Sequence, residues 1–170
     1  MTALTLTHVA LSLIGIASGF VVIGGLITAK QLDRWTVLFL ASTILTSVSG
    51  FFFPADHFTP GHAVGILSLL VLGPAVWARY REQMAGRWRI TYAICAMIAQ
   101  YFNFAVLVIQ SFDKVPALKA LAPSQSEPPF VVTQLVVLAL FVALTIAAAM
   151  RFRDPSNYKP KAPTNVAALS

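Results

Sequence analysis

The chain has 170 residues and a formal net charge of +6, and 58% of its residues are hydrophobic whereas only 11% are charged. A mean hydropathy of +0.77 excludes an ordinary soluble domain, in which about a quarter of the residues are charged. The positive charges flank apolar segments, where basic side chains meet lipid headgroups, so we expect the lipid bilayer and not a nucleic acid as the partner.

Five apolar segments are long enough to cross a bilayer, because a helix rises about 1.5 Å per residue and the hydrocarbon core is about 30 Å thick. None contains Asp, Glu, Lys or Arg away from its ends. The predicted spans are about 7–29, 35–53, 61–79, 90–111 and 130–150. We therefore expect an all-α integral membrane protein, with five transmembrane helices in one compact bundle over residues 1–153.

The basic residues predict the topology of this bundle. Lys114 and Lys119 lie in the fourth gap, and the other ten of the twelve Lys and Arg residues lie in the first and third gaps or after the last span. The positive-inside rule then places the N-terminus outside and the C-terminus in the cytoplasm, as in a multi-pass protein of a bacterial inner membrane. The tail, 154–170, is rich in proline and polar residues and is predicted to be disordered.

Local signals predict several helix boundaries. Thr59 followed by Pro60 is typical of a helix N-cap, and 126–129 gives a similar start to the last span. Pro74 should kink the third helix, because proline removes a backbone hydrogen bond. In the long fourth gap, apolar residues at spacing three predict a short amphipathic helix over 116–122 on the outer membrane surface.

Small residues at spacing four mark faces where two helices can approach closely in lipid. The first helix carries Gly15 and Gly19, and the third carries Gly61 and Gly65. We expect these glycines to serve helix packing and assign them no catalytic role.

Amide and imidazole side chains are the candidate binding residues. An amide that faces lipid leaves its donors and acceptors unsatisfied, so these side chains should point into the bundle, mostly in its outer half. The candidates are His8, His62, Gln100, Asn103, Gln110 and Gln134. They predict a shallow polar pocket on the outer side that binds a small molecule, a lipid headgroup or a partner protein. The simpler interpretation is that they only form hydrogen bonds between helices.

Two further functions stay open. His8 and His62 lie at matching depth and are alternative axial ligands for haem b, and a polar slot between the first and third helices also suits a quinone. A structural accessory subunit of a homo-oligomer or of a larger membrane complex, packed through its glycine faces, is the other alternative. No nucleophile elbow, HExxH or P-loop is present, and Asp56 and His57 match no known metal motif, so we expect neither an enzyme nor a metal site.

Overall fold

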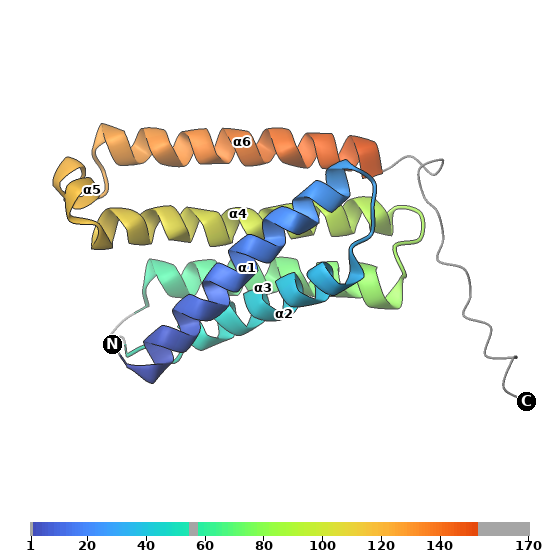
Figure 1. Ribbon diagram of the computed structural model, residues 1–170, viewed down its shortest axis with the longest axis horizontal. Coiled ribbons are helices and arrows are strands. Elements are labelled where there is room, and N and C mark those ends of the chain that lie inside the picture. The colour runs from blue at the N-terminus through green and yellow to red at the C-terminus, as the bar shows by residue number, and fades with distance from the viewer. Residues whose placement is uncertain (1, 55–57, 153–170) are drawn as a thin grey trace, which may run out of the picture.

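The computed structural model describes residues 2–54 and 58–152, and these residues form a bundle of helices (Figure 1). The elements are α1 (Ala3–Ile27), α2 (Asp33–Gly50), α3 (Pro60–Val76), the π-helical turn η1 (Trp77–Arg81), α4 (Trp88–Lys114), α5 (Pro116–Leu121) and α6 (Pro128–Phe152). The predicted all-α class is confirmed. The predicted tail, 154–170, and the loop residues Asp56 and His57 lie outside the described residues.

Four helices of the described chain are long and apolar enough to cross a membrane: Ala3–Ile27, Pro60–Arg81, Trp88–Lys114 and Pro128–Phe152. They correspond to four of the five predicted spans, and the exception is α2, which forms within the predicted span 35–53. The reason is compositional: α2 has only 18 residues, begins with Asp33 and Arg34, and carries several Ser and Thr side chains.

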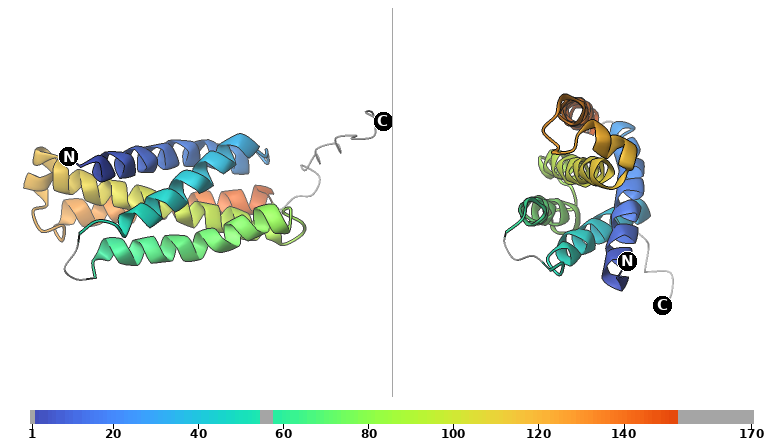
Figure 2. Two further views of the ribbon diagram at one scale, coloured as in Figure 1. Left: turned by 90° about the horizontal axis from the view of Figure 1, so that it is seen from below. Right: turned by 90° about the vertical axis from the view of Figure 1, so that its left-hand side faces the viewer.

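The first four long helices form a ring in which α1 packs on α2, α2 on α3, α3 on α4, and α4 on α1 (Figure 2). Outside this ring α6 packs on α4 and α1, and α5 packs on α4. Successive long helices run in opposite directions along the bundle (Figure 1). One end, called here the α5 end, holds α5 and the starts of α1 and α3. The other, the η1 end, holds η1, the α1–α2 turn and the end of α6.

Large side chains fill the ring, and large apolar side chains also cover the outside. Phe39, Leu72, Tyr92 and Met97 are buried in the core. On α6, by contrast, a row of apolar side chains is exposed, with Met150 70% exposed. An outer surface of this kind is suited to lipid, since acyl chains impose no cost on exposed apolar groups.

The predicted helix boundaries can be compared with the observed ones. The Thr59 hydroxyl accepts a hydrogen bond from the His62 backbone N–H at 3.3 Å, and Pro60 follows it, which confirms the N-cap. Pro74 lies inside α3, and the helix widens into η1 at Trp77. Proline supplies no N–H, so the Leu70 carbonyl loses its helical donor in the turn before Pro74, and the π-helical turn follows three residues after Pro74. The short helix predicted at 116–122 is confirmed as α5.

The basic residues of the described chain gather at the η1 end. This end contains Lys30, Arg34, Arg79, Arg81, Arg87, Arg89 and Arg151. The α5 end contains only Lys114 and Lys119 among the described residues. The two ends of the helix bundle therefore differ strongly in charge.

Candidate functional site

The centre of the bundle is a buried amide, Gln100, between α4 and α1. Its side chain is fully buried, and its Nε2 donates a hydrogen bond to the Ile16 carbonyl oxygen at 2.9 Å. It occupies the space above Gly19, where a β-carbon would lie 2.0 Å from the Gln100 Oε1. Glycine at this position is therefore what allows α1 to approach α4 with the amide between them.

One turn closer to the α5 end, Asn103 joins α4 to α2. Its Nδ2 donates a hydrogen bond to the Thr43 hydroxyl at 3.1 Å. Gly15 lies beside this pair, since a β-carbon there would be 3.2 Å from Thr43 Oγ1 and 3.5 Å from Asn103 Nδ2. The face of α1 that carries Gly15 and Gly19 is thus occupied by side chains of this same chain, and a partner helix would need another surface.

The other two predicted amides lie apart from this cluster. Gln134 is half-buried, and its Nε2 donates a hydrogen bond to the Ala105 carbonyl oxygen at 3.2 Å, which ties α6 to α4. Gln110 is exposed near the end of α4. Within the described residues, Gln110 makes no recorded side-chain hydrogen bond.

The two predicted histidines lie at the α5 end, each against the segment that ends α2. His8 Nδ1 is 2.8 Å from the Ser49 hydroxyl, and its ring meets Phe53 edge to face with centroids 5.1 Å apart. His62 Nδ1 accepts a hydrogen bond from the Thr59 N–H at 3.2 Å, and its ring stacks on Phe51. Since α1 and α3 both pack on α2, phenylalanine rings that follow α2 cover parts of both imidazoles.

The second glycine pair lies at the start of α3. A β-carbon on Gly65 would lie 3.2 Å from Phe51 Cζ and 3.6 Å from the Ser47 carbonyl oxygen, so this glycine faces α2 closely. Gly61 lies in the capped first turn, where a β-carbon would be 3.6 Å from Thr59 Oγ1.

Three buried side-chain oxygens in the described residues have no hydrogen-bond partner: Thr46 Oγ1, Ser68 Oγ and Gln100 Oε1. They belong to α2, α3 and α4, which are consecutive helices of the ring. A buried polar atom without a hydrogen-bond partner lowers the stability of the fold by roughly 1–3 kcal/mol. Such atoms usually bind an ordered water or a ligand.

Gln100 was among the binding residues predicted from the sequence, whereas Thr46 and Ser68 were not. Serine and threonine in helices commonly donate to a carbonyl one turn earlier, as Ser18 does to Ile14 and Ser42 to Leu38. Sequence alone cannot distinguish these satisfied hydroxyls from unsatisfied ones. Only the packing of the ring reveals that Thr46 and Ser68 lack partners.

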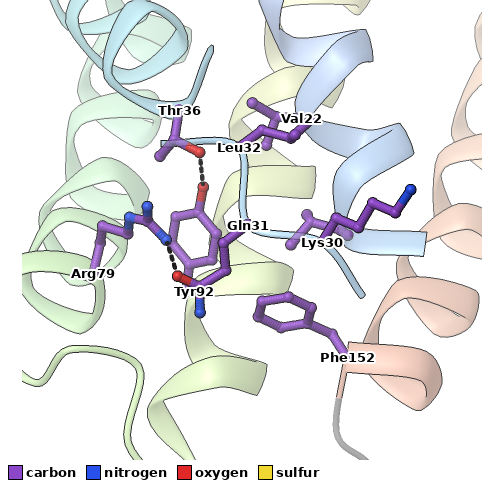
Figure 3. A pocket seen from close by; sticks show the side chains of 9 residues that line it. Val22, Lys30, Gln31, Leu32, Thr36, Arg79, Tyr92 and Phe152 are labelled. Atoms are coloured by element: carbon purple, nitrogen blue, oxygen red, sulfur yellow. Dashed lines mark hydrogen bonds between the residues drawn. The ribbon is translucent and has the colours of Figure 1, made fainter. Parts of the chain in front are cut away.

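A second polar cluster, also unexpected, lies at the η1 end around Arg79. The guanidinium forms an ion pair with Asp33, and its Nη1 donates to Gln31 Oε1 at 3.4 Å (Figure 3). It also lies 5.8 Å from the centre of the Tyr92 ring, whose hydroxyl is 3.3 Å from the Thr36 hydroxyl. The Arg79 side chain is only 9% exposed. The sequence marked this arginine only as a topology signal, because its partners come from two distant segments, residues 31–33 and α4.

This cluster borders a small cavity of about 10 Å³ beneath the α1–α2 turn. Its polar lining comes from Lys30, Gln31, Thr36, Arg79 and Tyr92, and apolar side chains of α1, of the α1–α2 turn and of α6 complete it (Figure 3). Among the described residues, no group of three His, Cys, Asp or Glu side chains is placed to hold a metal ion.

Comparisons of the chain with protein-family models, with curated proteins and with solved structures found no match. Function is therefore inferred from the two polar clusters themselves.

Proposed function

We propose that the chain is a five-span protein of a bacterial inner membrane, with the α5 end outside and the η1 end in the cytoplasm. Two observations support this topology. α2 runs antiparallel to its neighbours along the bundle (Figure 1), and its 18 residues extend about 27 Å, close to the thickness of a hydrocarbon core. The basic residues gather at the η1 end, as the positive-inside rule requires of a cytoplasmic end.

Within this topology, we propose that the outer half of the helix ring admits water and binds a small hydrogen-bonding molecule. The observation that carries the proposal is the set of three unpartnered oxygens on Thr46, Ser68 and Gln100. From the α5 ends of their helices they lie 4, 8 and 14 residues deep (50−46, 68−60 and 114−100). That is about 6, 12 and 21 Å at 1.5 Å per residue, so the two hydroxyls lie in the outer half of the ring and Gln100, near the middle of α4, would form the floor of the site.

The chemistry of these oxygens limits the ligand. The hydroxyls of Thr46 and Ser68 can donate or accept a hydrogen bond, whereas Gln100 Oε1 can only accept one. The molecule must therefore carry at least one donor, such as a hydroxyl or an amine. His8 and Ser49, hydrogen-bonded at the α5 end, would supply a polar rim to its entrance.

Cysteine labelling tests whether water reaches this half of the ring. In a Cys95→Ala background, Thr46→Cys and Ser68→Cys should react with the membrane-impermeant reagent MTSET added from outside. The matched controls are Leu45→Cys and Leu67→Cys, the preceding positions, whose side chains are about half exposed on the surface that would face lipid. A thiol in lipid forms little thiolate and should not react. If Thr46→Cys and Ser68→Cys stay as unreactive as the controls, the proposed water-accessible site does not exist.

The same reagent decides whether α2 crosses the membrane. Ala3→Cys and Gln83→Cys are separated by α1, α2 and α3. Three spans would place the two positions on opposite sides, with Ala3→Cys labelled in intact cells and Gln83→Cys labelled only after permeabilisation. If both react from the same side, α2 does not span and the five-span proposal is wrong.

The haem or quinone alternative and the accessory-subunit alternative stay predictions. In the described structure no contact favours either over the outer-side site, and the Gly15–Gly19 face is already filled by Gln100 and Asn103.

A further inference from the structure

We propose that the cavity at the η1 end is a binding site for a phosphate group, carried by a membrane phospholipid or by a free phosphate compound. The site is independent of the proposed outer-side site, since the two lie toward opposite ends of the bundle. Its volume of about 10 Å³ has room for roughly one oxygen atom. One phosphate oxygen would enter the cavity while the rest of the group stays at its mouth.

Arg79 supplies a guanidinium donor to the cavity. Its Nη2 is engaged by Asp33, which is not part of the cavity lining. Its Nη1 donates to two weak acceptors, Gln31 Oε1 at 3.4 Å (Figure 3), which is long for a hydrogen bond, and Met84 Sδ at 3.5 Å. A phosphate oxygen is a stronger acceptor than a neutral amide and can replace Gln31 on this nitrogen.

The charge that selects an anion comes from Lys30. Its side chain lies at the exposed α1–α2 turn and lines the cavity, and no ion pair is recorded for it within the described residues. Since Asp33 offsets Arg79, the uncompensated positive charge is that of the Lys30 ammonium, which points away from Arg79 in this structure (Figure 3) and would have to turn toward a bound anion. Basic pockets between helices at a cytoplasmic membrane face are suited to anionic headgroups.

The apolar wall of the cavity distinguishes it from a purely polar anion site. Val22 and Leu26 of α1, Leu32 of the turn and Phe152 of α6 form this wall. Because the cavity has room for only one oxygen, the glycerol and acyl groups of a phospholipid would lie outside it, along the apolar surface of the bundle.

Native mass spectrometry of the full-length protein in detergent, titrated with dioleoyl phosphatidylglycerol, tests the site. We expect one saturable lipid in the wild type and about tenfold weaker binding in Lys30→Gln, because a charge-assisted contact is lost. Lys30→Arg keeps the charge and should bind nearly as well as the wild type. Arg81→Gln is the matched control: it removes one exposed charge at the same end from outside the cavity and should change binding less than about twofold.

Inorganic phosphate as a competitor then identifies the source. Displacement of phosphatidylglycerol by millimolar phosphate would assign the site to free phosphate compounds, and retention of the lipid would assign it to phospholipid; the phosphate site stands in both cases. Two results would overturn it: no saturable binding of either probe, or equal weakening by Lys30→Gln and Arg81→Gln, which would mean diffuse attraction to surface charge. Unchanged helical circular dichroism in each variant verifies that the fold is intact.

Discussion

Gly19 of α1 lies directly against the side-chain amide of Gln100 in α4, so closely that a β-carbon at residue 19 would be 2.0 Å from Oε1. The amide in turn donates to the Ile16 carbonyl oxygen of α1 at 2.9 Å. The bare backbone at Gly19 therefore leaves the space that the Gln100 side chain fills in the centre of the bundle.

The substitution Gly19→Ala should destabilise the protein, because the added methyl group forces Gln100 out of its place. Overpacking a filled interior typically lowers the free energy of unfolding by about 1–3 kcal/mol. Thermal unfolding in detergent, followed by circular dichroism, measures the change. Gly24→Ala on the same helix is the control, since a β-carbon there meets no atom within 4 Å, and alanine should leave stability equal or slightly higher.

The double variant Gly19→Ala/Gln100→Ala should lose less stability than the sum of the two single variants, because the shortened residue 100 leaves room for the new methyl group. Strict additivity would show that Gln100 is not the obstacle and would contradict the contact described above.

Asn103 and Thr43 should be energetically coupled through their hydrogen bond of 3.1 Å. A double-mutant cycle with Asn103→Ala and Thr43→Val should give a coupling energy of about 0.5–1.5 kcal/mol, the range found for polar contacts between membrane helices. Chemical unfolding of the four proteins in mixed micelles provides the measurement. A coupling energy near zero would mean that Asn103 and Thr43 do not form this hydrogen bond in the micelle-bound protein.

Arg79→Lys should destabilise the η1 end although it keeps the charge. The planar guanidinium contacts Asp33 and Gln31 through two different nitrogens and also lies near the Tyr92 ring. A lysine ammonium cannot make all three contacts at once. We expect the free energy of unfolding to fall by about 1 kcal/mol. Arg81→Lys, at an exposed neighbouring position, should have no measurable effect, and an equal effect of both substitutions would contradict a specific role for Arg79.

The turn before α6 should loosen in acid through Glu127. Desolvation raises the pKa of this carboxyl, but hydrogen bonds from Ser124 and Ser126 outweigh it, so the pKa lies below its ordinary value. Because the folded-state pKa is depressed, the stabilisation is present above the ordinary value and is lost as the pH falls through the folded pKa. Hydrogen-exchange protection of the backbone amides in 124–131 should therefore decrease as the pH falls from the ordinary carboxyl pKa through the folded-state pKa. Glu127→Gln should show low protection and little dependence on pH; a dependence like that of the wild type would exclude Glu127 as its cause.

Sequence patterns are sufficient to locate the helices that are long and apolar throughout. The predicted spans 7–29, 61–79, 90–111 and 130–150, of which only 61–79 carries a charge, at Arg79, each coincide largely with a long helix, because length and hydropathy are properties of a continuous segment. The segment 35–53 is the weaker case. Its helix, α2, is polar along the side that meets Gly15 and Asn103. The mean hydropathy of the segment does not show that this polar side is buried against other helices.

The sequence by itself determined the helical class, the positions of the main apolar helices, the N-cap at Thr59 and the short helix before α6, since each follows from residues near one another in the chain. Only the tertiary structure decided that Gln100 fills the space over Gly19, that Thr46 and Ser68 lack partners, and that Arg79 reaches Asp33. The physical reason is that hydrogen-bond satisfaction and burial depend on which helices are neighbours in the ring. Those contacts join residues up to 84 positions apart, as between Ile16 and Gln100.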